Sequence, residues 1–310
     1  MATSNFKAFF APETITALQW VGEDRLVVAG YKAMGLYNRE GLLLVSIAHG
    51  ARKLAWHPGA GFVRFLQQHA DAVECSSPRD WYWNEQDIRW VNHGVYYANC
   101  GLFDSVGNYV HGGELYDTGY CTLLDAEEQK KAFGQRLPIV MALAFSPQGK
   151  QLLIGCKRLQ LFIWSFSAQL ERAKTYQSQT GIYTVAWSDS GRFIAAGQVT
   201  GLLEIWDLVS EERVAEITIV PAHEPSYKVL VRKIDFLPGC DHLLLVSTYK
   251  LTRLIDWREG KTIRSAKDYH CFALSPSGQQ IALGSTDGRV CCGDASLDFL
   301  EQNELSINKN

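Results

Sequence analysis

Side chains that could carry catalysis occur throughout the sequence, but none stands at a spacing that a known catalytic motif uses. The eight histidines are isolated from one another, and His57, which precedes a proline, is more typical of a turn than of a general base. Carboxylates such as Asp71, Glu74, Asp104 and Asp117 are scattered, with nothing to pair them. The sequence contains no glycine-rich phosphate loop, no G-x-S-x-G turn and no H-E-x-x-H motif. The sequence therefore offers no motif for catalysis, and we predict no cofactor.

The eight cysteines are not arranged for chemistry either. They are too sparse for a disulfide scaffold, they include no C-x-x-C pair, and no histidine pair at metal spacing accompanies them. Several lie inside apolar, strand-like runs, namely Cys156, Cys271, Cys291 and Cys292. A free cysteine in such a run packs as a small apolar side chain. We expect reduced, buried thiols and no metal site.

A cluster of aromatic residues, "DWYWNEQDIRW" at positions 80–90, could bind a ligand by stacking. Trp81 and Trp83 are two residues apart, so they share one face of a strand. Such a pair serves either as core packing or as an exposed platform for sugars, bases or a partner protein. Both interpretations stay open at this point.

Composition and charge exclude several classes of protein. The chain has 310 residues and a net charge of −3, with basic and acidic residues interspersed. This gives no electrostatic footprint for nucleic acid or for an anionic membrane. The first residues lack the apolar core of a signal peptide, and no apolar run approaches the roughly 18 residues of a membrane helix. We expect a cytoplasmic protein.

The elements that hold these residues follow a repeat. Its unit is a strand ending in a large apolar residue, a turn rich in Gly, Pro or Ser, and a second strand, as in "ALAFSPQGKQLLIG" (142–155), "TVAWSDSGRFIAAG" (184–197) and "CFALSPSGQQIALG" (271–284). The equivalent residues of seven units are Trp20, Trp56, Trp90, Phe145, Trp187, Phe236 and Leu274. Their average separation is about 42 residues, the length of a four-stranded propeller blade.

The fifth unit shows the physical reason for the repeat most clearly. Its four predicted strands are residues 182–188, 192–198, 202–208 and 213–219, separated by short turns containing Gly, Asp or Ser. The inner strands are apolar on both faces, as expected for strands that are buried on both sides. One such sheet cannot bury its faces alone, so several must stack around an axis. Trp206 in the third of these strands is expected to pack between blades.

Specific motifs connect this repeat to a known family. The turn "FSPQG" at Phe145–Gly149, the turn "SPSG" at Ser275–Gly278, "IWD" at 205–207 and "GSTDGRV" at 284–290 are typical of WD repeats. Over nearly its whole length the chain resembles the WD-repeat β-propeller family. The resemblance implies an all-β fold, a seven-bladed β-propeller of four-stranded antiparallel blades, in a single domain spanning residues 1–310.

The copies depart from the family pattern in one respect. A WD repeat often joins a His, a Ser or Thr, an Asp and a Trp in one hydrogen-bonded network. The seventh unit has Ser285 and Asp287 but no Trp, and the fifth has Trp206 but Thr200 where the Asp belongs. The fold prediction therefore depends on the period and the turns.

Two stretches interrupt the regularity. The longest interval contains the charged segment 125–138, which we interpret as an insertion or long loop between blades three and four, either a solvated connector or a partner-binding element. The seventh unit has only three clear strands, so residues 5–11 are predicted to supply its outer strand. The rival candidate is residues 297–302.

WD-repeat propellers are mostly interaction platforms, so the resemblance implies a non-catalytic scaffold or adaptor subunit. In the family, partners bind at the face where each first strand begins, four residues before the aligned aromatic. This offset selects Thr16, Arg52, Gln86, Met141, Tyr183, Arg232 and His270, and the residue before the second turn adds Lys157, Val199, Tyr249 and Thr286. From these we predict that Arg52, Met141, Tyr183, Arg232, Tyr249, His270 and Lys157 bind the partner. We expect an acidic peptide or loop of a protein partner, and a monomer within a hetero-complex. The alternative is a lectin-like propeller or glycan hydrolase that uses the tryptophan cluster or paired acids at the channel.

Overall fold

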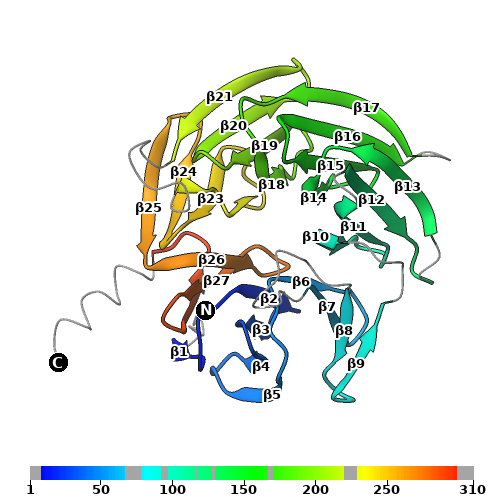
Figure 1. The fold of residues 1–310 in the computed structure, drawn as a ribbon. Coiled ribbons are helices and arrows are strands. Elements are labelled where there is room, and N and C mark those ends of the chain that lie inside the picture. The colour runs from blue at the N-terminus through cyan, green and yellow to red at the C-terminus, as the bar shows by residue number, and fades with distance from the viewer. Residues whose placement is uncertain are drawn as a thin grey trace.

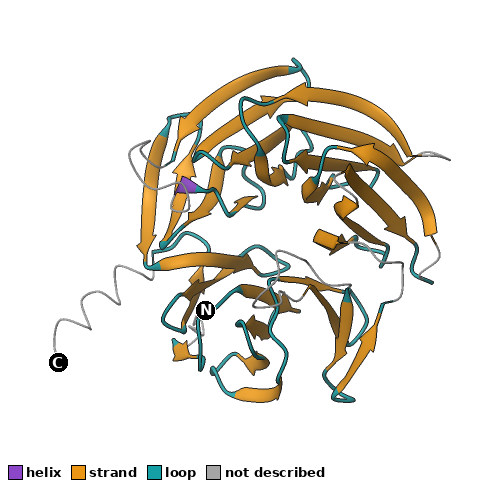
Figure 2. Ribbon diagram, in the orientation of Figure 1, coloured by secondary structure: helices purple, strands orange, loops and turns teal. Residues whose placement is uncertain are grey.

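The structure, a computed structural model, is built from seven four-stranded antiparallel sheets arranged as the blades of a ring (Figure 1). It describes residues 8–66, 78–91, 97–115, 118–127, 130–166, 170–219 and 229–298. Strands and connecting turns make up almost all of this part of the chain (Figure 2). The prediction of an all-β, seven-bladed propeller is confirmed. No helix in the described ranges is long and apolar enough to span a bilayer.

The blades follow one another along the chain, each beginning with the strand nearest the centre of the ring (Figure 1). Blade one holds β2 (Ala17–Val21), β3 (Arg25–Ala29), β4 (Met34–Asn38) and β5 (Leu43–Ile47), and blade two holds β6 (Lys53–Trp56), β7 (Phe62–Leu66), β8 (Arg79–Tyr82) and β9 (Asp87–Trp90). Blade three holds β10 (Tyr97–Phe103), β11 (Tyr109–Leu115), β12 (Thr118–Leu124) and β13 (Lys130–Leu137). Blade four holds β14 (Val140–Phe145), β15 (Gln151–Cys156), β16 (Gln160–Phe166) and β17 (Leu170–Gln177).

The remaining three blades complete the ring. Blade five holds β18 (Ile182–Trp187), β19 (Phe193–Gln198), β20 (Leu202–Asp207) and β21 (Glu212–Thr218), and blade six holds β22 (Lys233–Phe236), β23 (Leu243–Thr248), β24 (Leu251–Asp256) and β25 (Lys261–Lys267). Blade seven holds β26 (Tyr269–Leu274), β27 (Gln280–Ser285), β28 (Arg289–Asp294) and β1 (Phe9–Phe10). In blade five each predicted strand lies within one residue of its observed bounds.

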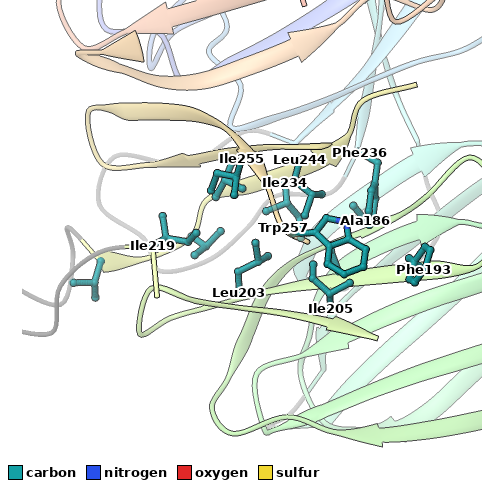
Figure 3. Close-up of a cluster of buried hydrophobic side chains, with 14 residues drawn as sticks. Ala186, Phe193, Leu203, Ile205, Ile219, Ile234, Phe236, Leu244, Ile255 and Trp257 are labelled. Carbon is teal, nitrogen blue, oxygen red and sulfur yellow. The ribbon is translucent and has the colours of Figure 1, made fainter. Parts of the chain in front are cut away.

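The core lies between neighbouring blades, and the contact between blades five and six illustrates it (Figure 3). Leu203 and Ile205 of β20 face Ile234 of β22 and Ile255 of β24, all of them buried. Removing such side chains from water contributes roughly 25 cal/mol per Å² of apolar area. Because both faces of every inner strand are used in this way, the alternation of polar and apolar residues is lost in the sequence.

The third blade corrects one sequence alignment. Trp90, taken as the end of an inner strand, closes β9, the outer strand of blade two. The true equivalent is Phe103 at the end of β10, followed by the turn "DSVG" and Gly107 at φ +93°. This "F-x-x-x-G" turn repeats the "FSPQG" turn of blade four, where Gly149 has φ +66°. With Phe103 in place of Trp90, the intervals between blades become more even.

Residues 125–138 are also placed differently from the prediction. Lys130–Leu137 forms β13, which pairs with β12 as the outer strand of blade three. The stretch is thus part of a blade and not an insertion between blades. The interval before blade four seemed long because it was counted from Trp90, which belongs to blade two. The charged residues of this stretch lie in an outer strand.

The N-terminal segment closes the ring, as predicted. β1 pairs antiparallel with β28 through Phe9 opposite Val290 and Phe10 opposite Arg289. The ring of Phe9 also stacks on Tyr37 of blade one, with centroids 4.6 Å apart. Residues 5–7 of the predicted strand, and most of its rival at 297–302, lie outside the described residues.

Candidate functional site

The inner ends of the first strands surround a central cavity of about 480 Å³. Every blade contributes to its lining, from β2, β6, β10, β14, β18, β22 and β26 (Figure 1). We use the name channel mouth for six of its side chains, Arg52, Lys53, Tyr183, Arg232, Lys233 and His270. They come from blades two, five, six and seven, so only closure of the ring brings them together.

The cavity contains most of the residues that the sequence singled out. Arg52, Met141, Tyr183, Arg232 and His270 line it, as does Thr16. Four others are not part of the lining of this cavity, namely Lys157, Tyr249, Val199 and Thr286. Tyr249 nevertheless lies next to it, because the guanidinium of Arg232 stacks over its ring at 5.7 Å.

Gln86 was placed wrongly, as a consequence of the alignment on Trp90. It lies in the turn between β8 and β9, at the outer edge of blade two. Asn99 occupies the equivalent position four residues before Phe103, and its Nδ2 donates a hydrogen bond to the Val140 carbonyl, 3.0 Å away. The signal for this residue was present in the "F-x-x-x-G" turn at 103–107.

A hydrogen bond between blades two and five crosses the channel mouth. Nη2 of Arg52 donates to Oη of Tyr183 at 2.8 Å, and Nζ of Lys53 lies 5.9 Å from the centre of the same ring. Burial acts to raise the pKa of Tyr183, but the charges of Lys53, Arg52 and Arg232 and the hydrogen bond outweigh it, so the pKa is lowered. The tyrosine thus reports a positive potential in the channel.

Two lysines that the sequence analysis did not select strengthen this potential. Lys53 and Lys233 directly follow Arg52 and Arg232, and both line the cavity. Nζ of Lys233 lies 3.2 Å from Oδ2 of Asp235, which is the single carboxylate in the lining that the structure describes. Four cationic side chains therefore face one carboxylate.

His270 contributes no positive charge at neutral pH. It is 5% exposed, and its Nε2 lies 2.8 Å from the carbonyl oxygen of Ile15. Burial and the nearby charge of Arg232 lower its pKa to about 4, against the opposing effect of the bond to Ile15. A carbonyl only accepts hydrogen bonds, so Nε2 carries the hydrogen of the neutral ring.

The tryptophan cluster belongs to the core. Trp81 and Trp83 are 0% and 6% exposed, with centroids 6.5 Å apart in an edge-to-face arrangement. They pack with Val63 and Phe65 of blade two and with residues of blade one. These side chains form no exposed platform for a ligand.

Blade five contains a polar network in the place of the incomplete family motif. Ser178 donates to Oε2 of the fully buried Glu204 at 2.5 Å, and Gln198 donates to Ser178 at 2.8 Å. Nη1 of Arg213 donates to the other oxygen of Glu204 at 2.6 Å. Trp206 packs against Tyr176 of blade four, with centroids 5.0 Å apart, as expected for a residue between blades.

Neither a metal-binding cluster nor a disulfide occurs in the described part of the chain. No three His, Cys, Asp or Glu side chains there are gathered as a metal ion would require. Cys100, Cys121, Cys156, Cys240, Cys271, Cys291 and Cys292 are free thiols. Burial raises the pKa of the Cys271 thiol to about 12, although Lys233 and Arg232 oppose that effect.

Comparison with known proteins adds to the geometry. Residues 170–207 match the family described as "WD domain, G-beta repeat". The chain is also similar to the "Periodic tryptophan protein 2 homolog" of Dictyostelium discoideum, with 29% identity over 154 residues. The chain is thus similar to WD-repeat proteins, and its fold is a seven-bladed β-propeller. The aligned region covers 46% of this chain and 16% of the relative.

The matched WD repeat does not coincide with one blade. It begins at β17, the outer strand of blade four, and ends at β20, the third strand of blade five. A WD repeat therefore links two neighbouring blades across their shared core. Blade five, which contains most of the match, also supplies Tyr183 to the channel mouth.

Proposed function

We propose that this WD-repeat propeller is a non-catalytic scaffold that binds a partner protein at the channel mouth. The observation that carries the proposal is the convergence of Arg52, Lys53, Arg232 and Lys233 on a cavity lined by one carboxylate, Asp235. The family supports the general role, because WD-repeat propellers mostly serve as interaction platforms. That support is an analogy from the fold, and the site supplies the specific argument.

The chemistry of the channel mouth favours an acidic peptide or loop. Each arginine presents a fixed fork of donors that matches a carboxylate, and each lysine adds a point charge. Tyr183 adds a large contact area at low cost in conformational entropy. Aspartate or glutamate side chains lowered into the cavity would therefore find donors from blades two, five and six together.

The second candidate, a carbohydrate-binding or glycan-hydrolysing propeller, finds no supporting observation among the described residues. Hydrolysis of a glycosidic bond needs two carboxyl groups facing each other. The cavity lining offers Asp235 alone, and its nearest cation is Lys233. A cytoplasmic location and a monomer within a hetero-complex remain predictions.

A quantitative capture experiment tests the proposal. Tagged wild-type protein and the double variant Arg52→Glu/Arg232→Glu are incubated with a lysate of the source cells, and bound proteins are quantified by mass spectrometry. Charge reversal of two contacts at a binding centre is expected to weaken a complex by about 2 kcal/mol or more. A specific partner should therefore be depleted from the variant.

A matched double variant controls for net charge. Lys150 follows the turn after β14 and Lys261 begins β25, so both lie at the opposite ends of the strands from the channel mouth. Lys150→Glu/Lys261→Glu changes the charge equally and should retain the partner. Equal capture by both double variants, with unchanged melting temperatures, would place the binding surface elsewhere.

A further inference from the structure

The turn between β22 and β23 contains a cysteine and a histidine in direct contact. Sγ of Cys240 lies 3.2 Å from Nδ1 of His242. Nε2 of the same imidazole lies 3.9 Å from Oδ2 of Asp256, at the end of β24. Sγ also lies 3.6 Å from Nε2, so the thiol lies beside the imidazole within reach of both ring nitrogens, and the carboxylate lies near Nε2. They lie at the far end of β22 from Lys233 and have no part in the channel mouth.

The backbone holds this arrangement in place. Oδ1 of Asp256 accepts hydrogen bonds from the backbone N–H groups of Arg258 and Glu259, at 3.0 and 3.1 Å, which leaves Oδ2 directed toward His242. The amide of Cys240 donates to the Leu237 carbonyl at 3.0 Å, and the amide of Trp257 donates to the His242 carbonyl at 3.0 Å. These hydrogen bonds hold Cys240 and His242 in contact in the folded chain, so no rearrangement of the turn is needed before they react.

Neighbouring groups clamp the turn further. The amide of Gly239, at φ +72°, donates to Oδ2 of Asp189 in blade five at 2.8 Å. The indole of Trp257 donates to the carbonyl of Asp241 at 2.6 Å. Both side chains of the pair remain accessible, since Cys240 is half-buried and the His242 side chain is 40% exposed.

We propose that Cys240, His242 and Asp256 form a reactive-thiol site that is oxidised by small hydroperoxides. Reactivity of a thiol depends on a nearby group that can take its proton, and on access. His242 Nδ1 is within reach of the thiol proton, and the carboxylate of Asp256 stabilises the imidazolium that forms. Five of the cysteines that the structure describes are buried and offer no such access.

The reaction balances without any further reagent. The sulfur of Cys240 attacks one oxygen of the hydroperoxide, so an S–O bond forms and the O–O bond breaks. The cysteine is oxidised by two electrons to the sulfenic acid, and the peroxide is reduced to water or an alcohol. The proton taken up by His242 is passed to the leaving oxygen.

The test compares two cysteines of the same folded chain. Wild-type protein is treated with hydrogen peroxide at pH 7 in the presence of dimedone, and labelling at each cysteine is followed by peptide mass spectrometry. Cys271 is the internal control, because it is also half-buried but has a raised thiol pKa and donates to the Gly284 carbonyl. Cys240 is expected to be labelled at least about tenfold faster than Cys271. Equal rates would overturn the proposal.

Variants of His242 and Asp256 test the role of each residue in the oxidation of Cys240. His242→Ala should reduce labelling of Cys240 about tenfold, and free imidazole in the buffer should restore part of the rate. Asp256→Asn keeps the acceptor for the two backbone N–H groups and removes the charge, so it should slow labelling only when His242 is present. Labelling of Cys271 reports any loss of the fold. An unchanged rate in His242→Ala, or an Asp256→Asn effect that persists without the histidine, would contradict the assignment.

Discussion

At the scale of single residues, blade two contains a buried ion pair that also contacts blade three. Nε and Nη2 of Arg64 donate to the two carboxylate oxygens of Asp80 at 2.6 and 2.7 Å. The side chains are 1% and 5% exposed, and the guanidinium lies over the ring of Tyr109 in blade three at 4.4 Å. The pair therefore connects two strands of one blade and the face of the next.

Asp80→Asn should destabilise the protein strongly. The variant leaves the Arg64 charge buried without its counter-ion, which typically costs about 3 to 5 kcal/mol. Urea unfolding at pH 7 measures the change. The paired substitution Arg64→Met/Asp80→Leu removes both charges and should cost clearly less than the single one. A single variant within about 1 kcal/mol of wild type would show that the pair is not coupled to folding.

His270 makes the stability depend on pH in one direction. Its pKa is about 4 in the folded chain and near 6.5 when exposed, so the unfolded chain binds the extra proton first. The contribution of the neutral His270 side chain to the free energy of unfolding is fully present above pH 6.5 and is lost as the pH is lowered toward 4. Between pH 7 and pH 5 this residue should account for about 2 kcal/mol. Unfolding free energies of wild type and His270→Gln at both values measure it, and equal pH dependence of the two proteins would argue against the neutral buried imidazole.

At the scale of elements, ring closure depends on the two residues of β1. Phe9 packs on Tyr37 and against the core between blades seven and one, whereas Phe10 is 72% exposed. Both residues pair with β28 through their backbones. The two phenylalanines therefore separate the contribution of the side chain from that of the strand.

Phe9→Ala should lower the free energy of unfolding by about 2 to 3 kcal/mol, because it removes a large, partly buried ring. Phe10→Ala, its neighbour, should change it by less than about half a kcal/mol. Thermal or urea denaturation of the two variants side by side makes the comparison. If both variants melt with the wild type, the stacking on Tyr37 does not hold the ring closed.

Most elements could be predicted from the sequence because the turns are local. The turn after each inner strand contains a glycine with a positive φ. It lies four residues after the aligned residue at Gly149, Gly191 and Gly278, and two or three residues after it at Gly22, Gly59 and Gly239. The assignment of blade three was wrong because Trp90, an aromatic residue in the outer strand of blade two, was aligned in place of Phe103. Neither an aromatic residue nor a glycine four residues later distinguishes an inner strand from an outer one, because Gly94 follows Trp90 at the same spacing as Gly107 follows Phe103. The pairing of the strands decides between them.

The site was less predictable than the elements. A constant offset from the turn was sufficient to place Arg52 and Tyr183 at the same cavity. Their hydrogen bond joins residues 131 positions apart, and only the curvature of the closed ring determines it. The neutral state of His270 likewise depends on burial and on the charge of Arg232, which outweigh the opposing hydrogen bond to Ile15, and neither residue is close to His270 in sequence.

At the scale of the whole molecule, the charge of the chain and the charge of the channel differ in sign. The net charge is −3, yet the described lining of the cavity carries Arg52, Lys53, Arg232 and Lys233 against Asp235. Confined cations in a low-dielectric cavity act together on an incoming anion, and this effect weakens as salt is added. Binding of an acidic segment should therefore be local to the channel mouth and sensitive to ionic strength.

Fluorescence anisotropy with a fluorescein-labelled peptide of six glutamates most directly tests whether the channel mouth binds an acidic segment. The peptide is titrated with wild type, with Arg52→Glu/Arg232→Glu and with the control Lys150→Glu/Lys261→Glu at two salt concentrations. We predict salt-dependent binding to wild type and control, and a loss of affinity of about 30-fold or more in the channel variant, corresponding to about 2 kcal/mol. Equal affinity of the channel variant and the wild type, or a loss confined to the control, would contradict the account.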